Sequence, residues 1–324
     1  MHRPELTTSA ADSTADSQGV RMSLENREIV VYDSSQSHHY QHLAPGSILR
    51  LELEQVGTSI FLETNPCVWA PTAFTTEMCQ LILADTCIGK RVLDFAAGSG
   101  ILGIVAGMQG ARQVIFTDLN PQAIVMATRN WHLNQLPPGQ ATFLESNCFE
   151  AVSPYLQQTG KVDRIYSNPP TFPGTREFFQ KLVADREPHA ASDWNHNGRW
   201  GRFVTDALIM QGGTLLNPGG EILFVTTSRQ GARRTQQLMD HYWGPGMTSD
   251  RADPLDYAHP WTERGEANWV VVHRLDLPLA DYYWEFLPLY EEMVTSLGEV
   301  EPVVEKGGIL YQKLYFIRAI KPPT

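Results

Sequence analysis

A run of small residues near position 98 has the types and spacing needed to hold a nucleoside. Gly98 and Gly100 connect an apolar stretch to a helical one. Without a Cβ the backbone can approach a ligand closely, and the following helix presents free N–H groups. Asp118 comes about twenty residues later, at the end of the next expected strand, where its carboxylate can accept hydrogen bonds from ribose hydroxyls. The structural alternative is an ordinary strand-to-helix turn and a helix-capping aspartate.

The residue before this turn discriminates between two nucleoside cofactors. In a dinucleotide site the glycines hold a pyrophosphate, which a neighbouring carboxylate would repel. Asp94 stands directly before the turn and suits the cationic methionyl end of S-adenosylmethionine (SAM). We therefore expect SAM rather than NAD.

A second run, Asn168 to Phe172, follows another apolar stretch. Its two prolines remove backbone donors and stiffen the chain, which leaves the Asn168 carboxamide and the Pro169 carbonyl as fixed acceptors. Such acceptors can hold both protons of an –NH2 group and direct its lone pair at a methyl carbon. The run predicts methyl transfer to a planar or amino nitrogen, although an isolated Asn-Pro-Pro can simply end a strand.

The elements that must position these residues alternate from residue 90 onward. Strands are expected at 91–95, 113–117, 141–145, 162–167, 220–226, 268–274 and 309–320, and helices at 101–108, 121–134, 203–216 and 230–242. Parallel strands need crossover connections, so this alternation predicts a doubly wound, mostly parallel α/β sheet of seven strands. Ligands bind at the carboxyl ends of such strands, where both motifs would lie.

The first run resembles the first motif of class I (Rossmann-like) SAM-dependent methyltransferases, and Thr117–Asn120 resembles their second motif. The resemblance implies a cofactor site made of Asp94, Ala96, Gly98, Ser99, Gly100, Asp118, Leu119, Asn147 and Cys148. Ala96 replaces a glycine usual in the family, which is tolerable if its φ stays negative. Asn147 replaces a usual Asp, but its amide oxygen can still accept the adenine amino proton.

The Asn-Pro-Pro run resembles the signature of methyltransferases that modify glutamine amides and the exocyclic nitrogens of adenine or guanine. Residues 68–77 resemble the segment that closes over SAM in those enzymes, which adds Trp69 and Thr75 to the cofactor site. Thr171 stands where the signature has an aromatic residue. Either Phe172 stacks on the planar target, with Pro170 and Thr171 beside it, or the target is not a flat nitrogen base.

Composition limits the partners. The 324 residues carry a net charge of −11, which disfavours nucleic acid, so we expect a small molecule or a protein side chain as acceptor. The four cysteines form no C-x-x-C pair and no apolar stretch approaches the roughly 20 residues of a membrane span, which favours the cytoplasm. His38, His39 and His42 complete no metal-binding spacing, so no metal is expected.

Three regions are expected: a flexible tail at 1–22, a β-rich substrate or lid module at 23–88, with strands at 28–32, 48–56 and 59–63 and a helix at 75–85, and a methyltransferase domain at 89–324. Trp194, His196 and Trp200 are candidate lining residues of the acceptor pocket. The aromatic segment 281–297 is interpreted as core. Arg229, Arg233 and Arg234 are interpreted as the charged start of a surface helix, with binding of a substrate carboxylate or phosphate as the alternative.

Four other functions stay open at this point. They are O-methylation of a small acid or hydroxyl compound, methylation of an RNA base, a dinucleotide-dependent dehydrogenase and a catalytically silent SAM-fold scaffold. The oligomeric state is not predicted.

Overall fold

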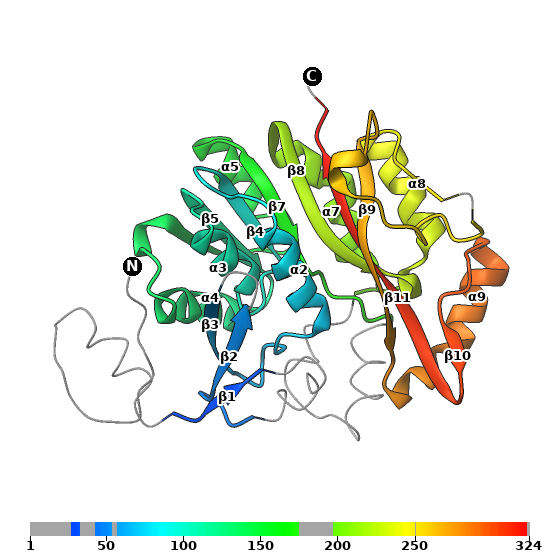
Figure 1. The fold of residues 1–324 in the computed structure, drawn as a ribbon, viewed down its shortest axis with the longest axis horizontal. Helices are drawn as coiled ribbons and strands as arrows, with labels where there is room; N and C mark the ends of the chain where they lie inside the picture. The colour runs from blue at the N-terminus through cyan, green and yellow to red at the C-terminus, as the bar shows by residue number, and fades with distance from the viewer. Residues whose placement is uncertain (1–26, 33–42, 54–56, 175–196, 250, 323–324) are drawn as a thin grey trace.

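A computed structural model describes residues 27–32, 43–53, 57–174, 197–249 and 251–322. These residues form a sheet of eight strands and a separate sheet of three (Figure 1). The predicted fold class, a large and mostly parallel α/β sheet with a small N-terminal sheet, is confirmed. The expected tail at 1–22 and the three clustered histidines lie outside the described residues. Within the described ranges, no helix is long and apolar enough to cross a membrane.

Five parallel strands form the half of the large sheet that carries the motifs, in the order β6-β5-β4-β7-β8. They are β4 (Arg91–Phe95), β5 (Gln113–Asp118), β6 (Ala141–Glu145), β7 (Val162–Ser167) and β8 (Leu216–Thr227). Every residue of β4 is buried, because the strand is central and both of its faces are covered. The carboxyl ends of β4, β5 and β7 share one edge of the sheet, as both motifs require.

The other half of the sheet is antiparallel. Strand β11 (Ile309–Ile320) pairs with β8 along one edge and with β9 (Trp269–Pro278) along the other. The short β10 (Val304–Lys306) pairs with the start of β11 and makes an eighth strand where seven were expected. Its sequence, Val-Glu-Lys, is too short and too polar to stand out as a strand.

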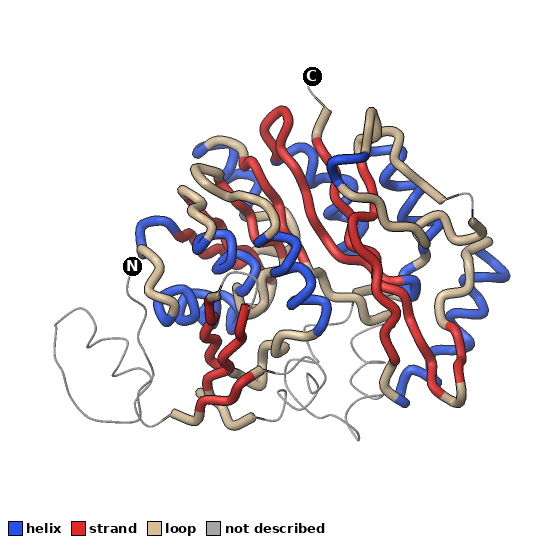
Figure 2. Tube along the Cα trace, viewed as in Figure 1, coloured by secondary structure: helices blue, strands red, loops and turns tan. Residues whose placement is uncertain are grey.

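Helices cover both faces of this sheet (Figure 2). One apolar core packs beneath α2 (Ala73–Leu83), α3 (Ile101–Met108) and α4 (Pro121–Leu133), and the other beneath α5 (Val152–Thr159), α7 (Phe203–Leu215) and α8 (Ala232–Trp243). Successive residues of a strand point to opposite faces. Val92 accordingly belongs to the first core and Leu93 to the second.

A third apolar core lies at the far end of the antiparallel strands. It is built largely from η7 (Asp281–Phe286) and α9 (Leu287–Leu297), and it includes buried Tyr283, Phe286 and Tyr290. The interpretation of this aromatic segment as core is confirmed. Three other short 3-10 helices are η3 (Pro138–Gln140), η5 (Ser228–Gln230) and η6 (Trp261–Glu263).

The small sheet contains β1 (Ile29–Val31), β2 (Ile48–Leu53) and β3 (Thr58–Glu63). Asn130 in helix α4 and Asn134 at its C-cap form hydrogen bonds with the backbone of β3, as a neighbouring strand would do. Asn134 accepts a hydrogen bond from the backbone N–H of Phe61 (3.0 Å) and donates one to its carbonyl (2.7 Å). Asn130 accepts from the N–H of Glu63 (2.7 Å) and donates to the carbonyl of Ser99 (2.9 Å). These amides tie the small sheet to α4 and to the glycine turn.

Several predicted elements have the observed bounds, namely 91–95, 101–108, 141–145, 162–167 and 309–320. The helix expected at 75–85 begins earlier, at Ala73, because Thr72 and Thr75 form a capping box. Helix α5 was not predicted from the sequence; its proline, Pro154, lies in the first turn, where a helix tolerates proline.

Candidate cofactor and acceptor site

A cavity of about 840 Å³ opens at the carboxyl ends of β4, β5 and β7. This volume lies in the usual range of small-molecule sites. Most of the predicted site residues line it: Trp69, Thr75, Ala96, Gly98, Ser99, Asp118, Leu119, Asn147, Cys148, Asn168, Pro169, Pro170, Thr171 and Phe172. The fold therefore brings the two motifs together around one space.

The glycine turn is held in a left-handed conformation. Ala96, Gly98 and Gly100 have φ values of 57°, 53° and 79°. A Cβ on Gly98 would meet no atom within 4 Å, so this glycine borders open space, whereas a Cβ on Gly100 would lie 2.8 Å from that of Ala127. We expected Ala96 to be tolerated with a negative φ, and this expectation is wrong because its φ is positive. The alanine instead holds a conformation that costs about 1–2 kcal/mol.

Asp118 fixes this turn with the same carboxylate that borders the cavity. Its Oδ2 accepts from the N–H of Gly98 and its Oδ1 from the N–H of Asn120, each at 2.8 Å. Burial raises the pKa of this carboxyl group. Each carboxylate oxygen has a second lone pair, so the group can also accept hydrogen bonds from two hydroxyls.

Asp94 lies fully buried beneath the turn and does not line the cavity. Its Oδ2 accepts from the N–H of Gly103 at 2.8 Å, whereas its buried Oδ1 has no hydrogen-bond partner among the described residues. Burial raises the pKa of Asp94 to about 8. A cationic ligand such as SAM fits this arrangement. Its positive charge would favour the ionised form of Asp94, whose Oδ1 lacks a partner in the described part of the chain, and the glycine turn above leaves open space.

Two segments after β5 and β6 also border the cavity. Leu119 is 52% exposed, which leaves a broad apolar surface beside Asp118. Asn147 donates to a carboxylate oxygen of Glu150 at 3.1 Å through Nδ2, so its amide oxygen stays available as an acceptor. Cys148 has a positive φ of 46°, a strained conformation at the cavity wall.

Asn168 is oriented by a residue from the segment expected to close over the cofactor. Its Nδ2 donates to the Thr75 hydroxyl at 3.1 Å, and Thr75 lies in the first turn of α2. The Ser167 hydroxyl donates to the carbonyl of Phe95 at 2.7 Å and so ties the end of β7 to β4. Among the described residues the amide oxygen of Asn168 accepts no hydrogen bond, which leaves it available to a ligand.

The loop after Asn168 is held by a residue that the sequence analysis did not single out. Asn197 is 2% exposed, donates to the carbonyls of Pro170 (2.5 Å) and Gly201 (2.9 Å), and accepts from the N–H of Val204 at 2.7 Å. A Cβ on Gly201 would lie 2.3 Å from the carbonyl oxygen of Thr171, so only glycine fits there. Neither residue belongs to a motif, so no signal in one sequence marks them.

Phe172 does not extend freely into the cavity. It is 6% exposed and lies among aromatic rings, with centroid distances of 6.1 Å to Trp69, 6.2 Å to Tyr282 and 5.6 Å to Tyr283. These rings form an aromatic wall that continues into the third core.

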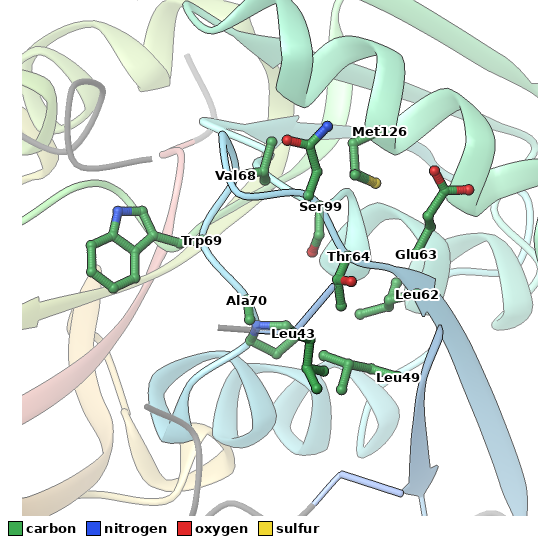
Figure 3. Close-up of a pocket in the computed structure, with 12 residues that line it drawn as sticks. Leu43, Leu49, Leu62, Glu63, Thr64, Val68, Trp69, Ala70, Ser99 and Met126 are labelled. Carbon is green, nitrogen blue, oxygen red and sulfur yellow. The ribbon is translucent and has the colours of Figure 1, made fainter. Parts of the chain in front are cut away.

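Figure 3 shows how the segment before α2 runs between the small sheet and the glycine turn. Leu43, Leu49 and Leu62 gather around a second, much smaller pocket that Ser99 also lines, whereas Trp69 points away from this group. Trp69 thereby contributes its ring to the large cavity.

Some predicted residues are not at the cavity. Gly100 packs against α4, and Trp200 lies in the third core with the Arg199 guanidinium 5.0 Å from its ring centroid. Trp194 and His196 lie outside the described residues. The interpretation of Arg229 as part of a surface helix is wrong, because Arg229 is 2% exposed and lines the cavity.

The parallel sheet, the left-handed glycine turn, the acidic residue after the next strand and the Asn-Pro-Pro loop around one cavity together resemble the core of a class I SAM-dependent methyltransferase. Comparisons with known proteins agree on this class. Residues 71–168 match the family model for "Ribosomal protein L11 methyltransferase (PrmA)".

Individual relatives share only part of their length with this chain. A "Putative protein N5-glutamine methyltransferase" of Methanocaldococcus jannaschii is 32% identical over 45% of this chain and 66% of its own length. The "Ribosomal RNA large subunit methyltransferase K/L" of a Shewanella species is 24% identical over 57% of this chain and 23% of its own. A solved 16S rRNA N2 G1207 methyltransferase of T. thermophilus, in complex with AdoMet and guanosine, is 18% identical with a TM-score of 0.45 and covers 64% of this chain and 48% of its own.

Proposed function

We propose that the protein transfers the methyl group of SAM to an amide or amino nitrogen of a small molecule or a protein side chain. The observation that carries this proposal is the Asn168 carboxamide, whose nitrogen is fixed by Thr75 while its oxygen stays available in the cavity. An oriented acceptor of this kind can hold an –NH2 proton.

The cofactor end of the proposed site is the turn side of the cavity. Asp118 would hold the ribose, Leu119 would cover one face of the adenine and Asn147 would accept its amino proton. Asp94 would face the cationic methionyl part through the turn, and the open space at Gly98 would allow close approach. SAM supplies an electrophilic methyl group when bound.

At the acceptor end, Asn168 and the Pro169 carbonyl would hold the two –NH2 protons and so orient the nitrogen lone pair. This orientation would let the nitrogen take the methyl group of bound SAM, with S-adenosylhomocysteine as the leaving group, and the nitrogen would then lose a proton to water. No strong base is needed, because the methylated nitrogen is transiently cationic and acidic. This step depends on positioning and on preorganised polar groups.

The lining of the cavity favours a nitrogen over a hydroxyl oxygen as the acceptor. Among the described lining residues there is no histidine, and the only carboxylate is that of Asp118, whose oxygens already accept two backbone N–H groups. A hydroxyl acceptor would need a general base, and the described part of the cavity offers none in a suitable state.

Methylation of an RNA base is the second candidate, since the Shewanella relative is named for ribosomal RNA. The net charge of −11 argues against it. A catalytically silent scaffold would not need a cavity lined by both motifs.

The small sheet and the segment before α2 would form a lid module over the cofactor.

The experiment that tests this proposal is methyl transfer from labelled SAM to cell extract separated into RNA, protein and small-molecule fractions. Label in the protein or small-molecule fraction, on nitrogen, supports the proposal. Label on RNA, or on oxygen, contradicts it, and failure to bind SAM in a calorimetric titration contradicts the activity itself.

A further inference from the structure

Arg229 is a buried cation held only by neutral groups. It lies in η5 after β8, and it donates to the Gln312 amide oxygen (2.7 Å) and to the Thr171 hydroxyl (3.2 Å). Its guanidinium lies 4.6 Å from the centroid of the Tyr283 ring. Burying a charge without an opposite charge is unfavourable, and a cation–π contact offsets only part of that cost.

The other arginines that are buried in the described ranges, Arg91 and Arg202, have more hydrogen-bond partners than Arg229. Arg91 donates to backbone carbonyls, including those of Thr159 and Lys161, and Arg202 forms an ion pair with Asp206 at 2.7 Å. Arg229 has no carboxylate within ion-pair distance among the described residues, and its buried Nη1 lacks a hydrogen bond of regular geometry there, although the neutral Tyr290 hydroxyl interacts with the guanidinium. Its hydrogen-bonding capacity is therefore left incomplete by the protein.

The unsatisfied guanidinium lies on the acceptor side of the cavity. Its partner Thr171 is the third residue after Asn168, and Gln312 and Tyr283 line the same space. Among the described lining residues, Arg229 is the only arginine or lysine. The half-buried Tyr282 stacks on Tyr283 with a centroid distance of 4.6 Å and provides a flat surface next to the cation.

We propose that Arg229 binds a carboxylate group of the methyl acceptor, whose planar body lies along Tyr282 and Tyr283. The inference rests on the proposed function and narrows its substrate to small carboxylic acids that carry an amino or amide nitrogen. One guanidinium neutralises one negative charge, and its planar set of N–H donors matches the geometry of a carboxylate. Because Arg229 is 2% exposed, an RNA phosphate could reach it only if the RNA strand entered the cavity deeply. A small acid also requires a movement of side chains at the aromatic wall.

The first test is stability without ligand, using Arg229→Met and the control Arg202→Met. A binding arginine is unfavourable in the empty protein, so Arg229→Met should melt at or above the wild-type temperature. Arg202→Met leaves Asp206 without its partner and should melt lower. A melting temperature of Arg229→Met as low as that of Arg202→Met would show that Arg229 is structural and would overturn the proposal.

The second test is binding of defined probes to protein saturated with S-adenosylhomocysteine, measured by calorimetry. 4-Aminobenzoate should bind, 4-aminobenzamide should bind about 10- to 100-fold more weakly, and Arg229→Gln should remove that difference, as expected for loss of a charge-assisted hydrogen bond. Equal affinity for acid and amide overturns the carboxylate site, and preference for phenyl phosphate overturns the choice of anion. These outcomes do not depend on catalysis.

The third test separates this inference from the proposed function. Arg229→Gln should keep SAM affinity within about twofold while methyl transfer to the anionic small-molecule fraction falls by about 10-fold or more. A loss of SAM affinity would assign Arg229 to the carboxylate of SAM. A wild-type product found among uncharged amines would leave the methyltransferase proposal standing and overturn the anion site.

Discussion

At the scale of single residues, the site depends on polar side chains that form hydrogen bonds with the protein and keep part of their hydrogen-bonding capacity unused. Asn168 donates to Thr75 through its amide nitrogen, Asp118 accepts from the N–H groups of Gly98 and Asn120 with one lone pair of each oxygen, and Asp94 uses one of its two oxygens. Each is thus fixed by the protein; Asn168 and Asp118 can still contact a ligand in the cavity, and buried Asp94 can act on one only through its charge. Positioning of this kind is what methyl transfer requires.

Replacing Asn168 tests the mechanism most directly. Asn168→Ala should leave SAM affinity nearly unchanged and lower single-turnover methyl transfer by about 100- to 1000-fold, the usual cost of removing one preorganised polar group. The measurement uses saturating SAM once an acceptor fraction is known. A variant within a few-fold of wild type would rule out the proposed role of Asn168 and leave the cofactor site intact.

The raised pKa of Asp94 predicts a pH dependence of SAM binding. With a pKa of about 8, the carboxyl group is mostly protonated at neutral pH. A cationic ligand favours the ionised form, so binding should release a proton and affinity should increase as the pH rises through about 8. The amino group of SAM titrates in the same pH range. The variant Asp94→Asn keeps that titration, so the difference between the pH profiles of SAM affinity of wild type and variant gives the contribution of Asp94 alone. Parallel pH profiles would show that Asp94 only supports the turn.

The same shift makes a prediction about the free protein. The folded-state pKa of Asp94 lies above its unfolded value, so its contribution to stability is complete below about pH 4 and is lost as the pH rises through about 8. Wild type should therefore lose more stability than Asp94→Asn between about pH 6 and pH 9 in denaturant titrations. An equal loss would contradict the raised pKa.

Ala96 gives a prediction of the opposite sense, a gain in stability. Its φ of 57° is a conformation that glycine adopts without strain. Ala96→Gly should stabilise the protein by up to about 1 kcal/mol, since the relief of strain exceeds the added entropy of the unfolded chain. Thermal melting measures it, with Ala84→Gly, at a right-handed position, as the control that should be destabilised. A lower melting temperature for Ala96→Gly would mean that the turn needs the methyl group.

At the scale of elements, the asparagines of α4 join parts of the chain that are distant in sequence. Asn134→Ala would leave the N–H and carbonyl of Phe61 without their side-chain partner and should destabilise the protein by about 1–3 kcal/mol. Gln122→Ala, at an exposed position of the same helix, is the matched control and should have little effect. Equal melting temperatures for the two variants would show that the small sheet docks without this contact.

Sequence patterns predicted the parallel strands well because burial on both faces produces continuous apolar runs, as in residues 114–116 of β5. They predicted where the motifs meet because parallel strands share one edge. They failed for Arg229, since a charged residue before a helix usually faces solvent. The contacts of Arg229 with Thr171 and Gln312 join residues 58 and 83 positions away, a distance that no local pattern encodes.

At the scale of the whole molecule, the cavity is assembled from nearly the full described chain. The segment before α2 and the motifs of β4 to β7 supply one side, and β9, η7 and β11 supply the other. The matched family segment, 71–168, therefore covers the proposed cofactor side and ends at Asn168. The rest of the proposed acceptor side comes from parts of the chain outside that match, and this is where specificity should differ from the relatives.

Strand β11 is the last strand of the large sheet in chain order, yet it lies between β8 and β9. During synthesis the preceding strands emerge from the ribosome first, so the edge of β8 waits uncovered until residues 309–320 have appeared. An exposed, apolar strand edge invites pairing with other chains. A chain stopped after residue 306 should therefore aggregate in cell-free translation, while adding a synthetic 307–322 peptide during synthesis should increase the soluble fraction. A soluble, SAM-binding truncated chain would show instead that the motif-bearing half folds without the closing strand.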